Sequence, residues 1–129
     1  MTRLAFPAVS ARAVAVADAV AILAFTIAGI LSHRGSLPPS ALAEDTLPLL
    51  VGWFAAAAAF HLYTRRVWRA LLLTWIVGIP LGVLVRAAVL GRLDEPRQLA
   101  FLTTTLILSI VFVIAARSVV TIAARYSGR

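Results

Sequence analysis

The chain has 129 residues, of which 62% are hydrophobic and 13% are charged, and its mean hydropathy is +0.99. Soluble domains have about 45–50% apolar and about 25% charged residues, so this composition excludes an ordinary water-soluble fold. The net charge of +7 comes from arginines between apolar segments, which favours basic flanks of membrane spans over a nucleic-acid partner, and the lack of cysteine excludes disulfides.

Four long apolar segments follow one another along the chain. They lie at about 13–32, 47–64, 70–90 and 98–117. Each approaches the roughly 20 residues that a helix needs to cross the hydrocarbon core of a bilayer. The pattern predicts a single membrane domain over residues 1–129. Its fold class is all-α, a polytopic bundle of four transmembrane helices in the lipid bilayer.

The first apolar segment contains one carboxylate, Asp18. With 3.6 residues per helical turn, Asp18 lies on one stripe with Phe25, Gly29 and Ser32, and we expect this stripe to face the bundle. Ionisable residues at membrane depth are functional candidates, because inserting one unpaired costs about 2.5–3.5 kcal/mol or more. An ion pair that only stabilises the fold accounts for Asp18 equally well.

The connection to the second segment carries Gly35, two prolines and two acids. This composition predicts a turn-rich external loop over 35–45, with His33 at its start as a further polar candidate. An A-x-A sequence at 41–43 resembles a signal-peptide cleavage site. It lies across two prolines from the apolar run, which argues against cleavage.

Small residues recur in the third segment, where Gly78 and Gly82 form a G-x-x-x-G pattern. This pattern lets a neighbouring helix approach closely, and we assign Gly29 the same packing role in the first segment. Pro80 removes one backbone hydrogen bond, which predicts a kink. Trp53 and Trp68 are expected at the membrane interfaces, where tryptophan is enriched.

The rise of about 1.5 Å per residue decides which polar groups reach the same depth. Asp18, His61 and Arg117 fall near the same ends of their segments, so an inner cluster of these three is expected. An outer cluster is expected at the opposite end, and it consists of Ser32, His33, Thr46 and Arg86. Arg86 is therefore a poor partner for Asp18. Arg86 and Arg117 are also close enough to the ends of their helices for their side chains to reach the membrane interface.

The arginines are distributed unevenly between the two sides. Both termini and the connection between the second and third segments hold positions 3, 12, 65, 66, 69, 117, 125 and 129. The other loops hold Arg34, Arg92 and Arg97, offset by Glu44, Asp45, Asp94 and Glu95. The positive-inside rule then predicts a multi-pass protein of the cell membrane with cytoplasmic N- and C-termini.

Enzymatic motifs are missing from the sequence. There is no H-E-x-x-H, no nucleophile elbow and no phosphate-binding glycine loop. The two histidines, His33 and His61, are expected at opposite ends of the bundle and so cannot share one metal. The acidic pairs at 44–45 and 94–95 are consecutive loop residues. We therefore expect no enzyme, no cofactor and no metal site.

An ordered set of residues runs through all four segments. It comprises Asp18, Phe25, Gly29, Ser32, His33, Thr46, Pro48, Gly52, Trp53, Gly78, Gly82, Arg86, Phe101 and a final Arg117. In this order the chain resembles, over about residues 15–120, the small bacterial and archaeal membrane family catalogued as domain of unknown function 3054. The family often has Trp before the last arginine, where this chain has Ala116. The resemblance implies a four-helix protein of the bacterial inner membrane and no particular activity.

Two functions of different class remain open. One is a small transporter or channel-like subunit acting as a homo-oligomer, because four short helices enclose little volume alone. The other is a non-catalytic accessory or assembly subunit of a larger membrane complex. A transporter should need Asp18 or Arg86 for flux, whereas an accessory subunit should tolerate the loss of either charge.

Overall fold

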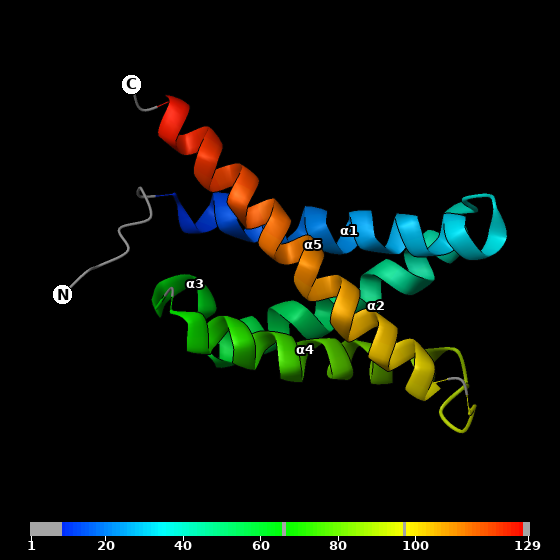
Figure 1. Cartoon of the computed structure of the whole chain (residues 1–129). Helices are drawn as coiled ribbons and strands as arrows, with labels where there is room; N and C mark the ends of the chain where they lie inside the picture. Colours follow the sequence, from blue (N-terminus) through cyan, green and yellow to red (C-terminus); the bar gives the residue numbers. More distant parts are fainter. Residues whose placement is uncertain (1–8, 66, 97, 128–129) are drawn as a thin grey trace.

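The computed structural model in Figure 1 is built of helices and describes residues 9–65, 67–96 and 98–127, with the backbone alone at 33, 34 and 127. The helices are α1 (Ala11–Arg34), α2 (Pro39–Ala59), α3 (Leu62–Arg65), α4 (Trp68–Val89) and α5 (Gln98–Ser127). Helices α1, α2, α4 and α5 are long and apolar enough to cross a membrane. The predicted all-α, four-span fold class is therefore confirmed.

Helix α1 begins and ends at residues suited to those positions. The Ser10 hydroxyl accepts a hydrogen bond from the Ala13 N–H at 3.1 Å, which satisfies one of the free N–H groups in the first turn. At the other end, Gly35 has a φ of 69°, and its N–H donates to the Leu31 carbonyl at 2.9 Å. Glycine adopts this left-handed conformation without a Cβ clash, so α1 ends there and the chain reverses.

Helix α2 begins earlier than the sequence pattern predicts. The expected loop over 35–45 is wrong from Pro39 onward, because the helix starts at Pro39. Proline suits the first position of a helix, since its ring fixes φ and its missing N–H would have had no partner there. Asp45 therefore lies on a helix and projects toward the other helices at a defined register.

The second predicted span also ends sooner than expected. Helix α2 ends at Ala59, and the backbone turns at Phe60 and His61, where His61 has a φ of 55°. The short helix α3 follows, and α4 begins at Trp68. The range 47–64 thus holds most of one spanning helix and then a turn with one short helix.

The four long helices pack in two pairs. Helix α2 packs most extensively on α4, and α1 packs most extensively on α5. Figure 1 shows α5 (orange) crossing α1 and α4 obliquely, with α3, the start of α1 and the end of α5 at one end of the bundle. At 30 residues α5 is about 45 Å long, longer than the roughly 30 Å hydrocarbon core. Its oblique path accounts for a helix that continues past the predicted end at residue 117.

A seam of three glycines joins α2 to α4. A Cβ added to Gly52 would overlap the backbone of both Gly78 and Gly82. A Cβ on Gly82 would lie 2.9 Å from the Leu49 Cα, and one on Gly78 would lie 3.1 Å from the Trp53 Cα. The G-x-x-x-G pattern of α4 therefore contacts the backbone of α2 directly, as small residues permit in membrane helices.

The other two predicted packing residues behave differently. No heavy atom outside its own helix turn lies within 4 Å of a Cβ placed on Gly29, so the packing role assigned to Gly29 is wrong. Gly29 lies near the C-terminal end of α1, where the next residue of the same stripe, Ser32, is already exposed. Pro80 lies inside α4, which continues on both sides of it, and the predicted kink stays a prediction.

Candidate functional site

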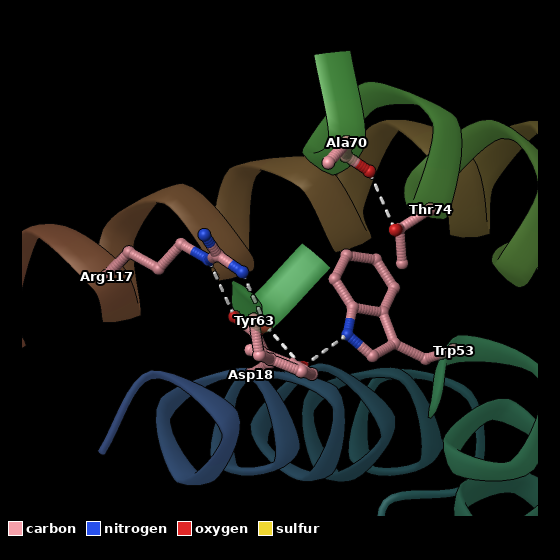
Figure 2. A network of polar contacts seen from close by, with 6 residues as sticks. All are labelled: Asp18, Trp53, Tyr63, Ala70, Thr74 and Arg117. Atoms are coloured by element: carbon pink, nitrogen blue, oxygen red, sulfur yellow. Dashed lines mark hydrogen bonds and ion pairs between the residues drawn. The ribbon is translucent and has the colours of Figure 1, made fainter. Parts of the chain in front are cut away.

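The carboxylate of Asp18 lies at the centre of a polar network inside the bundle (Figure 2). Its side chain is 0% exposed, and it pairs with Arg117 of α5, whose side chain is 23% exposed. Nε of Arg117 donates to Oδ1 at 2.8 Å, and Nη2 donates to Oδ2 at 2.7 Å. Two parallel hydrogen bonds of this kind are the strong geometry for arginine and carboxylate. The predicted contact between Asp18 and Arg117 is present.

Two aromatic side chains complete the network. The Tyr63 hydroxyl of α3 donates to Oδ2 of Asp18 at 2.7 Å. The indole Nε1 of Trp53, in α2, donates to the same hydroxyl oxygen at 3.1 Å. We call Asp18, Trp53, Tyr63 and Arg117 the Asp18 cluster. Its members come from α1, α2, α3 and α5. The Asp18 carboxylate of α1 bonds directly to α3 and α5, and Tyr63 connects it to Trp53 of α2.

The charges inside the Asp18 cluster balance, with one carboxylate and one guanidinium. Tyr63 lies in α3, outside the four spans. Burial, helped by the neighbouring Asp18 carboxylate, raises the pKa of Tyr63 above its ordinary value. The phenol therefore keeps its proton and serves as a donor. The Asp18 carboxylate is thus paired with Arg117 and also accepts a hydrogen bond from Tyr63. This arrangement avoids the free-energy penalty of an uncompensated buried charge.

His61 does not belong to the Asp18 cluster, and the predicted inner cluster is wrong on this point. Its side chain is exposed, and its backbone lies in the turn between α2 and α3. Because the helix ends before His61, depth along a continuous helix no longer fixes its direction. Tyr63, two residues later, reaches the carboxylate instead. The signal available in the sequence was an aromatic hydroxyl in the same segment.

The side chain of Trp53 is 0% exposed, so it lies in the core of the bundle. Its predicted place at the level of a membrane interface stays a prediction. Thr74 of α4 is buried near the same level, and its hydroxyl donates to the Ala70 carbonyl at 2.7 Å. Thr74 is thus satisfied within its own helix, whereas Trp53 needs Tyr63 as an acceptor. The sequence alone predicted neither Trp53 nor Tyr63 beside Asp18.

The stripe predicted for α1 faces the bundle over only part of its length. Asp18 and Phe25 are buried, and the Phe25 ring meets Phe112 of α5 edge-on with centroids 6.2 Å apart. Gly29 is half-buried and Ser32 is exposed. Near the C-terminal end of α1 this face of the helix therefore no longer packs on the other helices.

Arg86 forms a second ion pair near the other end of the bundle. Its Nε donates to Oδ1 of Asp45 at 2.6 Å, and the two side chains are 12% and 20% exposed. The guanidinium also lies over the Phe101 ring, 4.4 Å from the centroid. We call Asp45 and Arg86 the outer pair. The expectation that Arg86 would not reach Asp18 is confirmed, but its partner comes from the segment predicted as a solvated loop.

The rest of the predicted outer cluster does not gather around Arg86. Thr46 shares a hydrogen bond of 2.8 Å with Thr26 of α1, and both are buried. Ser32 is exposed. The side chain of His33, the remaining candidate, lies outside the described residues. Only Arg86 of that predicted group takes part in the outer pair.

An open cavity of about 360 Å³ lies beside the Asp18 cluster, at the end of the bundle where α1 begins and α5 ends. Arg117 and Tyr63 both line it. Asp18 itself is closed off, yet each of its two direct partners faces open space. Among the side chains that the structure describes, which do not include His33, no group of three or more His, Asp or Glu is placed to hold a metal ion.

The chain was compared with known families, curated proteins and solved structures. The family model described as "Protein of unknown function (DUF3054)" matches residues 15–120. The comparisons with curated proteins and with solved structures each found no match. The matched range contains the whole Asp18 cluster, the glycine seam and the outer pair.

Proposed function

The chain belongs to the DUF3054 family and is an integral membrane protein, and from this premise we propose that it is a small transporter or channel-like subunit. The observation that supports this proposal is the fully buried Asp18 carboxylate, whose partners Arg117 and Tyr63 line an open cavity. Ionisable residues inside membranes are expensive and mark ion or substrate pathways. The protein acts without catalysis and without a cofactor.

The proposed working form is an oligomer. The glycine seam closes the space between α2 and α4, so one copy leaves little room for a path through its own centre. Several copies around a common axis supply the missing walls. The proposed setting is the cell membrane, and in bacteria the inner membrane.

A second function is favoured by the exposure of α5. Only 17% of its span is buried inside the bundle, against 33% to 44% for the other three spans. Such a helix suits an accessory or assembly subunit that packs against a larger membrane complex. This alternative makes the Asp18 cluster a structural device and needs no ion movement.

Ion movement distinguishes the two functions. The full-length protein in liposomes should carry charge in a solid-supported membrane assay, with gradients of H⁺, Na⁺, K⁺ and Cl⁻ applied in turn. Asp18→Asn should abolish the current, because it removes the buried charge of the cluster. Glu44→Gln is the matched control, since Glu44 is an exposed carboxylate of α2, and it should leave the current unchanged.

The folded state of the variants is checked separately. The double variant Asp18→Asn with Arg117→Gln removes both charges, so it should insert and fold while carrying no current. A wild-type protein that carries none of the four ions above the protein-free background contradicts the transport proposal. Full current in Asp18→Asn contradicts it as well. Either result favours the accessory subunit, which is tested by the proteins that co-purify in mild detergent.

The arginine distribution predicts the orientation of the termini. Single cysteines replace Ser36, between α1 and α2, or Tyr126, near the end of α5, in a chain that has no cysteine of its own. With positive charges inside, an impermeant maleimide added to intact cells should label Ser36→Cys and spare Tyr126→Cys. Both should react after the membrane is permeabilised. The reverse pattern in intact cells contradicts cytoplasmic termini.

A further inference from the structure

The cavity beside the Asp18 cluster has a mainly apolar wall. Helices α1, α3, α4 and α5 all contribute to it, and its apolar lining includes Val14, Leu62, Leu71, Ile114 and Ile122. Its volume of about 360 Å³ lies in the range of pockets that hold small amphipathic ligands. The cavity is open on one side, so a ligand that is partly buried and partly in lipid fits it.

The polar part of the wall is cationic. Arg117 and Arg125 lie two helical turns apart on the same face of α5, about 12 Å along the axis. The hydroxyl residues Ser118 and Thr121 lie between them. None of the described residues that line the cavity is acidic. An anion entering this cavity therefore meets the guanidinium groups of Arg117 and Arg125, and the wall itself holds no carboxylate. Asp18, which balances the charge of Arg117, lies behind the wall.

Arg117 retains donor capacity toward the cavity. Its Nε and Nη2 are occupied by the Asp18 carboxylate. Figure 2 shows its other terminal nitrogen, Nη1, on the far side of the guanidinium from Asp18. The same side chain can therefore close the Asp18 cluster and present N–H groups to a second anion. Arginine suits this double use because its donors form a rigid, planar fork.

The surroundings of the cavity are those of a membrane interface. Trp68 lines the cavity and is 56% exposed, as expected of tryptophan at the level of lipid headgroups. Three exposed arginines stand at helix ends on this side of the bundle: Arg12 at the start of α1, Arg65 at the end of α3 and Arg69 at the start of α4. The acids Glu44 and Asp45, near the start of α2, and Asp94 and Glu95, between α4 and α5, belong to the opposite helix ends. This end therefore attracts negatively charged lipid headgroups.

We propose that this cavity is a binding site for an anionic phospholipid of the adjacent leaflet. Arg117 and Arg125 hold the headgroup phosphate, and the apolar wall takes the first part of one acyl chain. The remaining chain lies along the exposed surface of α5. The proposal is independent of transport, because it requires only the cavity and its two arginines. Basic pockets between membrane helices recognise acidic headgroups by this chemistry.

Native mass spectrometry of the full-length protein in detergent tests the site. Phosphatidylglycerol should remain bound where phosphatidylcholine with the same chains is lost. Arg125→Gln should lower the phosphatidylglycerol occupancy about fivefold, which corresponds to about 1 kcal/mol for one basic residue near an acidic headgroup. Arg69→Gln is the matched control, because Arg69 is exposed at the same end but does not line the cavity, and it should change the occupancy little.

Two further measurements distinguish a lipid site from a site for small anions and from a general effect of surface charge. Thr121→Trp fills the cavity without changing charge and should also lower phosphatidylglycerol occupancy. Excess inorganic phosphate should leave the lipid bound, because the acyl chain contributes to affinity. Equal retention of the two lipids, displacement by inorganic phosphate, or equal losses in Arg125→Gln and Arg69→Gln would each overturn the proposal. Arg125 is exposed, so its variant should fold like the wild type.

Discussion

Replacing Gly52 with alanine should strongly lower the thermal unfolding midpoint of the protein in detergent. The added Cβ meets the backbone of Gly78 and Gly82, and no side-chain rotation can relieve that contact. Helices α2 and α4 must move apart, which weakens the most extensive helix contact in the bundle. Overpacking of this kind costs about 1–3 kcal/mol, and we expect the upper end of that range because backbone is involved on both sides.

Gly29→Ala is the matched control for this experiment. It adds the same methyl group to a spanning helix, at a position where no heavy atom of another helix lies within 4 Å of the new Cβ. Alanine is favoured over glycine in a helix by about 0.8–1.0 kcal/mol, so its midpoint should stay the same or rise. Equal midpoints for Gly52→Ala and Gly29→Ala would show that the α2–α4 seam is not closely packed.

The second large effect concerns the ion pair of Asp18 and Arg117. Arg117→Gln leaves a carboxylate with 0% exposure and no opposite charge, and breaking a buried pair in this way costs about 3–5 kcal/mol. Asp18→Asn leaves a guanidinium that can still reach the open cavity, so it should be less harmful. The double variant removes both charges, and it should be more stable than Arg117→Gln alone.

Unfolding of the four proteins in the same detergent gives the coupling energy directly. The two single losses should sum to more than the loss in the double variant. Additive losses would mean that the two side chains do not act as a pair. Arg86→Gln with Asp45→Asn provides a matched cycle. Both members of the outer pair are partly exposed, so solvent screening should make their coupling smaller.

The pairing of Asp18 with Arg117 was accessible from the sequence because both residues lie on long helices. On such helices the rise per residue fixes depth, and depth alone brings the two side chains to one level. The same reasoning failed for His61, because α2 ends before it and the chain turns there. A short turn changes which side chain faces inward, and apolar periodicity does not reveal where within an apolar run such a turn falls.

The start of α2 shows the opposite kind of error. Two prolines and two acids favour a loop by composition, although proline also suits the first turn of a helix. Moving the helix start to Pro39 brings Asp45 into register with Arg86. Likewise the pattern Gly78-x-x-x-Gly82 indicated a close contact but not its partner. Gly52 supplies that partner, and only the three-dimensional pairing of α2 with α4 identifies it.

The two helix pairs have an electrostatic consequence for motion. Asp18 and Arg117 both belong to the α1–α5 pair, and Asp45 and Arg86 both belong to the α2–α4 pair. Each helix pair, which we call a body, thus contains both partners of one ion pair. Contacts between the bodies are of another kind: the hydroxyl bond of Thr26 with Thr46, the indole bond of Trp75 to the Leu106 carbonyl, and the stacking of Arg86 on Phe101.

A movement of one body against the other would therefore separate these three contacts and leave both ion pairs intact. Each of the two neutral hydrogen bonds contributes about 0.5–1.5 kcal/mol, far less than separating a buried charge pair costs. The glycine seam holds α2 and α4 in close backbone contact within one body. Tyr63 lies in α3, the short helix between α2 and α4, and its hydroxyl donates to the Asp18 carboxylate of the α1–α5 pair. Among the described residues, this is the hydrogen bond by which the α2–α3–α4 segment holds the Asp18 carboxylate.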